Sequence, residues 1–155
     1  MEWALPPVIK IYEALGAIAD GRVKLDSDTA KVYSSSGNKH YDVIYDAEAK
    51  AISSNDNGSY WQGYLGYPAI AFLMAKQIIS HDPKVGEWLK GFHWKDINTQ
   101  FKNDFAQTEN YIRDEMVKRG ADLKKFDQYK EKVVEDLTQL KLSKLKTKAQ
   151  PPKGY

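Results

Sequence analysis

The feature that most constrains the fold is a strand-rich region that lies between two predicted helices. Residues 30–34, 40–45 and 50–53 are short β-rich runs separated by polar turns, and residues 22–25 are a further short candidate. Three antiparallel strands are only marginally stable by themselves, so one face of this meander must pack on helices. The sequence therefore predicts an α+β fold with a three-stranded antiparallel sheet covered on one face.

The covering helices are predicted on either side of the meander. The first follows Leu5-Pro6-Pro7, ends at Asp20-Gly21, and carries one apolar face at helical spacing: Val8, Ile11, Tyr12, Leu15, Ile18 and Ala19. The second begins at Pro68 and is nearly all apolar through Met74, which is typical of a buried helix. A further short helix is expected from Asp82-Pro83 to near Gly91.

The last third of the chain changes to long amphipathic segments. One apolar stripe contains Ile97, Phe101, Phe105, Thr108, Ile112 and Met116, and the other contains Leu123, Phe126, Val133, Leu137 and Leu140. Because Arg119-Gly120 separates them, the pattern predicts an antiparallel helical hairpin. The expected organisation is a core at residues 1–94, a helical hairpin extension at 95–146, and a disordered basic tail at 147–155.

Composition excludes several classes of protein. The chain of 155 residues has no cysteine, which excludes disulfides, thiolate metal sites and cysteine catalysis. The longest apolar run, Ala69 to Ala75, is far too short to span a bilayer, and the N-terminal residues lack a basic signal-peptide region. We therefore expect a cytoplasmic protein without a membrane segment.

Metal and catalytic motifs are also missing from the sequence. His40, His81 and His93 are far apart and have no metal-ligand spacing, and no nucleophile elbow or phosphate-binding glycine loop occurs. Residues 34–36 offer three serines, but they precede Gly-Asn and are typical of a turn. The sequence predicts no enzyme activity, no cofactor and no bound metal.

The second predicted helix begins with a pattern that resembles the SWIM zinc-finger family. In that family the helix opens with Cys-Lys-His, two variable positions, Ala, a variable residue and Leu. The segment here is Gly66-Tyr67-Pro68-Ala69-Ile70-Ala71-Phe72-Leu73, with Ala71 and Leu73 at the matching apolar positions. Gly66 stands where the Cys would be, and Pro68 stands where the His would be.

The segments upstream carry the rest of the resemblance. Residues 34–43 are similar to the family's strand, turn and Tyr-x-Val entry, and the Cys-x-Cys would fall within residues 53–56, which are Ser-Ser-Asn-Asp. Residues 13–23 resemble the helix that precedes the module in small prokaryotic, particularly archaeal, SWIM-like proteins. The resemblance implies a degenerate module that has lost its zinc ligands. It also implies the family's association with protein and nucleic-acid contacts.

A structural zinc normally supplies much of the folding energy of such a module. We therefore expect zinc-independent folding, in which other interactions hold the loop before the second helix. The candidates are polar side chains that bond loop amides, the proline at the helix start, and packing of the loop's aromatic residues.

The candidate interaction residues fall in two groups. The aromatic group in the loop is Tyr60, Trp61, Tyr64 and Tyr67, which either forms an exposed binding surface or packs inward as a small core. The basic group near the C-terminus is Lys141, Lys144, Lys146 and Lys148, which either contacts phosphate groups or keeps the chain end solvated.

These observations predict a non-catalytic interaction module. It would bind a protein partner through the aromatic loop or the sheet edge. The alternative is a nucleic-acid-binding accessory protein that uses the aromatic loop and the lysine-rich tail. The sequence leaves the oligomeric state open.

Overall fold

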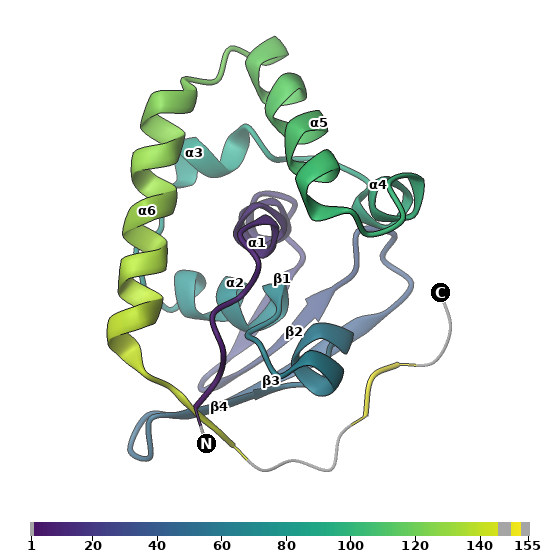
Figure 1. Ribbon diagram of the computed structural model, residues 1–155. Coiled ribbons are helices and arrows are strands. Elements are labelled where there is room, and N and C mark those ends of the chain that lie inside the picture. The colour runs from purple at the N-terminus through teal and green to yellow at the C-terminus, as the bar shows by residue number, and fades with distance from the viewer. Residues whose placement is uncertain (1, 146–149, 153–155) are drawn as a thin grey trace.

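The computed structural model describes residues 2–145 and 150–152. It confirms the predicted α+β fold, with helices packed on a five-stranded sheet (Figure 1). The strands lie side by side in chain order: β1 (Val23–Asp26), β2 (Thr29–Tyr33), β3 (His40–Asp46), β4 (Ala51–Ser54) and β5 (Ser143–Lys144).

The predicted strand number was too low. The meander contains four antiparallel strands, because Val23–Asp26 pairs with β2. The fifth strand comes from the far end of the described chain and pairs parallel to β4. A two-residue strand whose partner lies about ninety residues earlier leaves no local pattern, so the meander alone could not predict it.

Helix α1 (Ile9–Ala19) lies at the centre of the molecule, surrounded by the other helices and the sheet (Figure 1). It begins after the predicted Pro6-Pro7 pair and stops before Gly21, whose φ of 72° is the left-handed conformation expected there. Residues 11–17 are all buried, so the predicted apolar face understates how much of this helix is covered.

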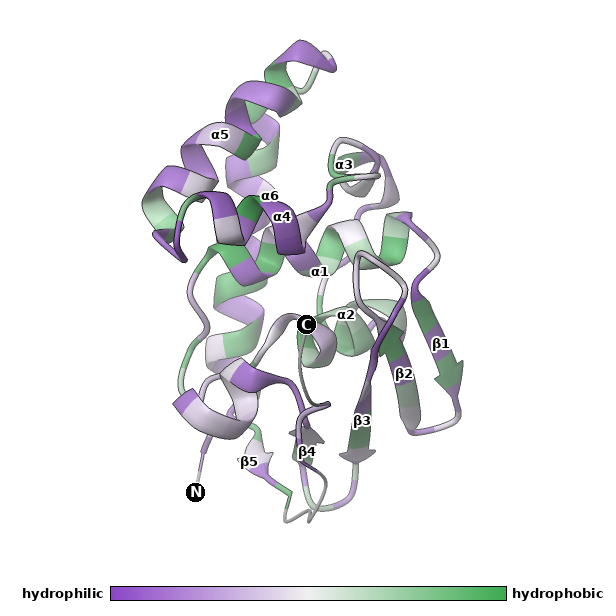
Figure 2. Cartoon of the chain, turned by 90° about the vertical axis from the view of Figure 1, so that its right-hand side faces the viewer, coloured by the Kyte–Doolittle hydropathy of each residue, from purple (hydrophilic) through white to green (hydrophobic). Residues whose placement is uncertain are grey.

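Helix α2 (Tyr67–Ala75) packs between α1 and the sheet, and residues 68–74 are all buried, as predicted. The sheet contributes Ala30, Val32 and Val43 to the hydrophobic cluster that contains α2, and these residues are at most 3% exposed. In Figure 2, α2 is mostly hydrophobic along its length, whereas α5 is mostly hydrophilic. This contrast reflects a buried helix and a helix that presents one side to solvent.

Short helical elements lie on both sides of α2 along the chain. The turn η1 (Gly58–Gln62) lies before α2, and α3 (Pro83–Glu87) and α4 (Trp94–Gln100) lie after it. The single long helix predicted from Ile97 to Met116 was wrong. Lys102 and Asn103 have positive φ values of 53° and 60°, which a helix does not accommodate. Asp104 then caps α5 (Phe105–Lys118).

Helices α5 and α6 (Leu123–Leu140) form the predicted hairpin, which turns at Gly120 with a φ of 87°. Buried residues of the hairpin belong to the same hydrophobic cluster as α1 and α2, and they include Ile112, Met116, Phe126 and Val133. The domain boundary at residue 94 stays a prediction, and the hydrophobic cluster extends across it.

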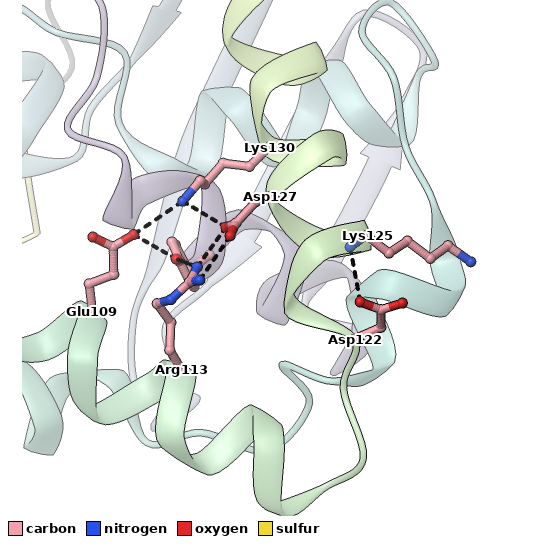
Figure 3. A network of polar contacts seen from close by, with 7 residues as sticks. Glu109, Arg113, Asp122, Lys125, Asp127 and Lys130 are labelled. Atoms are coloured by element: carbon pink, nitrogen blue, oxygen red, sulfur yellow. Dashed lines mark hydrogen bonds and ion pairs between the residues drawn. The ribbon is translucent and has the colours of Figure 1, made fainter.

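A polar network also ties the hairpin to α1 (Figure 3). Arg113 of α5 donates two hydrogen bonds to Asp127 of α6, at 2.6 and 2.9 Å, and a third to the Tyr12 hydroxyl of α1. The Tyr12 hydroxyl donates to Glu109 at 2.6 Å, and Lys130 pairs with both carboxylates. Every charge in this network has a partner of opposite sign, so we assign it to structure.

The predicted disordered tail at 147–155 falls mostly outside the described residues. Of its described part, the Gln150 carbonyl accepts a hydrogen bond from the Asn55 side chain at 3.1 Å. Among the helices that the structure describes, none combines the length and apolar character needed to cross a bilayer.

Candidate functional site

The loop between β4 and α2 is closed by one buried carboxylate. We call residues 54–66 the clasp loop. Asp56 is 6% exposed and accepts hydrogen bonds from the Ser54 and Ser59 hydroxyls and from the Ser59 backbone amide. The Ser59 hydroxyl oxygen in turn accepts from the Gly66 amide at 3.0 Å, so the chain connects the two ends of the loop.

Gly66 is required at its position by this network. A Cβ atom at residue 66 would lie 1.9 Å from the Asp56 Oδ2 atom. Gly66 also caps α2, whose first turn contains Pro68. Polar bonding of loop amides and a proline at the helix start were both expected from the sequence. The clasp loop contains the first, and Pro68 in the first turn of α2 is the second.

The structure separates the four predicted aromatic residues into two pairs. Tyr60 and Trp61 project to solvent at 40% and 69% exposure, and their rings meet edge to face at 4.6 Å. We call these two residues the aromatic pair. Tyr64 and Tyr67 turn inward: the Tyr64 ring covers Gly58, and the Tyr67 ring meets Tyr41 edge to face at 6.1 Å. Burial raises the pKa of both inward tyrosines.

The aromatic pair stands between two surface grooves. Trp61 and Gln62 line both of them. One groove has a volume of about 480 Å³ and contains Lys10 and Lys95, and the other has a volume of about 500 Å³ and contains Lys144. In the described part of the chain, no Asp or Glu lines either groove.

The predicted lysines do not gather at one place. Lys144 of β5 reaches the clasp loop, where its ammonium group lies 5.1 Å from the Trp3 ring centre, and a Cβ on Gly63 would lie 3.1 Å from it. Lys141 is exposed at the end of α6. Lys146 and Lys148 lie outside the described residues.

A second site, which sequence reasoning missed, is a pocket between α1, α4 and the clasp loop. We call it the polar pocket. Its volume is about 110 Å³, and its charged lining residues are Lys10, Glu13, Arg22, Asp56 and Lys95. Glu13 is 3% exposed and accepts hydrogen bonds from Asn98 at 3.1 Å and from Lys10 at 3.4 Å. Burial lowers the pKa of Lys10, but the Glu13 carboxylate together with Tyr64 and Asp56 more than offsets this, so the pKa is raised overall.

One signal in the sequence could have indicated this pocket. Glu13 is the only charged residue between Ile11 and Ala19, in a stretch otherwise typical of a buried helix. A charge buried in such a helix needs a partner, which here comes from Lys10 and from Asn98 of α4. The contribution of Asn98 had no signal, because it depends on how α4 packs across α1.

Metal binding finds no support in the described residues, where no three His, Cys, Asp or Glu side chains gather. Ser34, Ser35 and Ser36 form the predicted turn, with the Gly37 amide donating to the Ser34 carbonyl at 2.9 Å. The Ser34 and Ser36 hydroxyls bond each other at 3.1 Å.

Fold and site together define an α+β protein with a buried central helix, a clasped aromatic loop and a small polar pocket. The chain belongs to the family described as Uncharacterised conserved protein UCP014422, whose model matches residues 3–143. That range includes strands β1 to β4 and the helical hairpin, and it ends within β5. Neither a curated protein nor a solved structure matches the chain.

Proposed function

We propose that this chain is a non-catalytic interaction module that binds an acidic segment of a partner protein through the aromatic pair. The observation that carries the proposal is the exposure of Trp61. At 69%, it is the most exposed of the large hydrophobic side chains in the described residues. Trp and Tyr are enriched among the residues that dominate binding energy at protein interfaces.

The clasp loop makes the aromatic pair a rigid anchor. Asp56 fixes the backbone on which Tyr60 and Trp61 stand, since the Asp56 carbonyl accepts from the Tyr60 amide at 2.9 Å and its carboxylate binds Ser59. A pre-organised surface loses little conformational entropy on binding, so more of the contact energy appears as affinity.

The charges around the aromatic pair indicate the chemistry of the partner. Three lysines line the two grooves beside Trp61, of which Lys10 already pairs with Glu13, and no carboxylate is among the described lining residues. A partner segment that places an apolar side chain on Trp61 and carboxylates toward Lys144 or Lys95 matches this surface. We favour the aromatic loop over the sheet edge, because the open edge strand β1 is only four residues long and carries Lys24 and Asp26.

A nucleic acid is the alternative partner. Bases would stack on Trp61, and phosphates would contact Lys144 and the lysines of the C-terminal tail. Two observations favour a protein instead: the formal net charge is only +2, and the lysines at the grooves are not joined into a basic stripe. With no cysteine in the chain, we also propose a cytoplasmic location.

The proposal is tested by selecting binders from a random peptide library on the purified chain. Peptides should be enriched in acidic residues beside an apolar one, and their affinity should fall at least tenfold on Trp61→Ala. Val117→Ala is the matched control, because Val117 is 53% exposed on α5, and it should leave affinity unchanged.

Salt separates the two partner classes. Binding of an acidic peptide should weaken only modestly between low and physiological salt, because much of its affinity comes from the apolar contact with Trp61, whereas binding of a single-stranded oligonucleotide through several phosphates would weaken steeply. Peptides that bind Trp61→Ala as well as the parent chain would refute the proposal. Micromolar oligonucleotide binding that depends on residues 141–155 would replace it with the nucleic-acid function.

A further inference from the structure

Strand β1 forms an open edge of the sheet. In the described part of the chain, β1 pairs with β2 along one side and has no strand along the other (Figure 2). An open edge presents unpaired N–H and C=O groups to which a further strand can bond, and native proteins commonly protect it with charged side chains, lysine above all. The charges of β1 are of opposite sign, Lys24 and Asp26, so they do not repel a second copy of the same strand.

The register with β2 shows which backbone groups of β1 face the open edge. The Tyr33 amide donates to the Arg22 carbonyl at 2.9 Å, so residue 22 turns its backbone groups toward β2. Directions alternate along a strand, so the even-numbered residues of β1 also face β2, and Val23 and Leu25 face the open edge. A strand added at this edge would therefore bond to Val23 and Leu25.

The side chains of β1 are suited to such a strand. Leu25 lies opposite Ala30, on the face of the sheet that the helices cover, yet it is 45% exposed. Lys24 lies opposite Lys31, and neither Lys24 nor Asp26 forms an ion pair within the described residues. Like charges directly opposite each other destabilise a sheet, so an acid on the free side of Lys24 would be favourable.

Charge selects one register for two copies of β1. Antiparallel strands related by a two-fold axis place one residue opposite its own copy. Lys24 or Asp26 at that position would face a like charge, and Val23 there would place Lys24 opposite Arg22, again a like charge. With Leu25 at the axis, each Lys24 lies opposite Asp26 of the other copy. The same register lets the two Leu25 residues exchange both backbone hydrogen bonds, because their N–H and C=O groups face the edge.

We infer that two copies of this chain pair antiparallel through β1, with Leu25 at the two-fold axis, so that one sheet continues across both copies. The two Leu25 side chains meet there and leave water. The contact is short, so the dimer is weak and forms only at high protein concentration. Two strands separate β1 from β4, which leads into the clasp loop, so this surface is distinct from the aromatic pair and does not depend on the proposed function.

The test is sedimentation velocity of the purified full chain at low salt, from about 10 µM to 1 mM. We expect a monomer–dimer equilibrium with a dissociation constant below about 1 mM. Lys24→Asp places two acids opposite each other on both sides of the axis, and Asp26→Lys places two lysines there. Each variant should dimerise at least about tenfold more weakly than the parent chain.

Mixing the two variants identifies the register. One variant strand then carries two acids and the other carries two lysines, so their heterodimer has opposite charges on both sides of the axis. It should form with an affinity within about threefold of the parent dimer. Lys124→Asp is the matched control, because it makes the same charge change at an exposed position in the first turn of α6, and it should leave dimerisation unchanged.

Hydrogen exchange tests the same contact in the parent chain, without a variant. Exchange of the Leu25 amide should slow as the protein concentration rises. A parent chain that stays monomeric up to about 1 mM overturns the inference, as does Leu25 exchange that is independent of concentration. Dimerisation of Lys24→Asp as tight as that of the parent also overturns it, and so does a mixture of the folded variants that does not associate.

Discussion

Replacing Gly66 with alanine should open the clasp loop through a steric conflict at one atom. Gly66 has φ of −74° and ψ of 169°, an extended conformation that alanine adopts freely. The backbone therefore does not oppose the change. The added Cβ, however, would lie 1.9 Å from Asp56 Oδ2, where unbonded contacts need at least 3.0 Å. The carboxylate must move by more than an ångström.

The cost follows from what that carboxylate holds. Its movement would deprive the Ser54 hydroxyl, the Ser59 hydroxyl and the Ser59 amide of their acceptor inside the protein. Each buried donor left without a partner costs about 1–3 kcal/mol. With partial relaxation of the loop, we expect Gly66→Ala to lower the free energy of unfolding by about 3–5 kcal/mol. That is a large fraction of the 5–15 kcal/mol typical of a domain.

Urea denaturation followed by circular dichroism measures this loss. Gly86→Ala is the matched control, because a Cβ there would meet its nearest neighbour at 3.7 Å, an ordinary contact. Gly86 lies within α3, so its replacement should be neutral or stabilise by up to about 1 kcal/mol.

A double-mutant cycle identifies the cause. In an Asp56→Ala background, the carboxylate is absent, so Gly66→Ala should cost less than about 1 kcal/mol. An undiminished cost in that background, or a cost below about 1 kcal/mol in the parent chain, would refute the assignment of Gly66 to the Asp56 clasp.

Two further predictions concern pH and metal. The hydrogen bonds from Arg113 lower the pKa of Asp127 from 3.8 to about 2, so its contribution to stability is present above about pH 4 and is lost as pH falls through 2. Because the carboxylate is 38% exposed, solvent screening limits that contribution to about 1 kcal/mol. The stability difference between the parent chain and Asp127→Asn should shrink from about that value at pH 6 to near zero at pH 2; a difference independent of pH would contradict it. Addition of a strong chelator should leave the unfolding midpoint of the purified chain unchanged, and a fall in the midpoint that zinc restores would refute zinc-independent folding.

The elements with a strong local signal were predictable from the sequence. The two prolines before α1, the all-apolar stretch of α2 and the glycine turn between α5 and α6 each act within a few residues, and the structure places all three as expected. The break between α4 and α5 also had a local signal. Asp104 accepts from the Gln107 amide at 3.2 Å, and such a cap can be recognised in Asn103-Asp104. The apolar stripe from Ile97 to Met116 obscured it, because the spacing continues across the break.

The site was less predictable, because it depends on packing between distant segments. The sequence singled out the aromatic residues of the clasp loop but could not tell that Tyr64 covers Gly58 while Trp61 faces solvent. That outcome is decided by the π-helical turn at Gly58–Gln62, which has no recognisable sequence pattern. The polar pocket was even harder to predict from the sequence, because Arg22 and Asn98 come together with Glu13 only through the packing of three separate elements.

The resemblance to SWIM modules is a proposal, and it has an energetic consequence. A module of that kind without its zinc ligands needs other interactions to stabilise its fold. A structural zinc in a zinc-finger peptide supplies about 10–16 kcal/mol at pH 7, because such a peptide has almost no core. The Asp56 clasp supplies only a part of that, about 3–5 kcal/mol by the reasoning above. The remainder has to come from burial, and here the helical hairpin is the addition that a minimal module lacks. Phe126, Ile112 and Val133 of the hairpin are fully buried in the cluster that contains α1 and α2. At about 1.5–3 kcal/mol for each large side chain buried, three such residues already contribute about as much as the clasp or more.

On this reasoning the hairpin is not an independent appendage, and deleting residues 105–140 should unfold the sheet and the clasp loop along with it. A truncated chain that keeps a cooperative urea transition would show that the core does not need the hairpin.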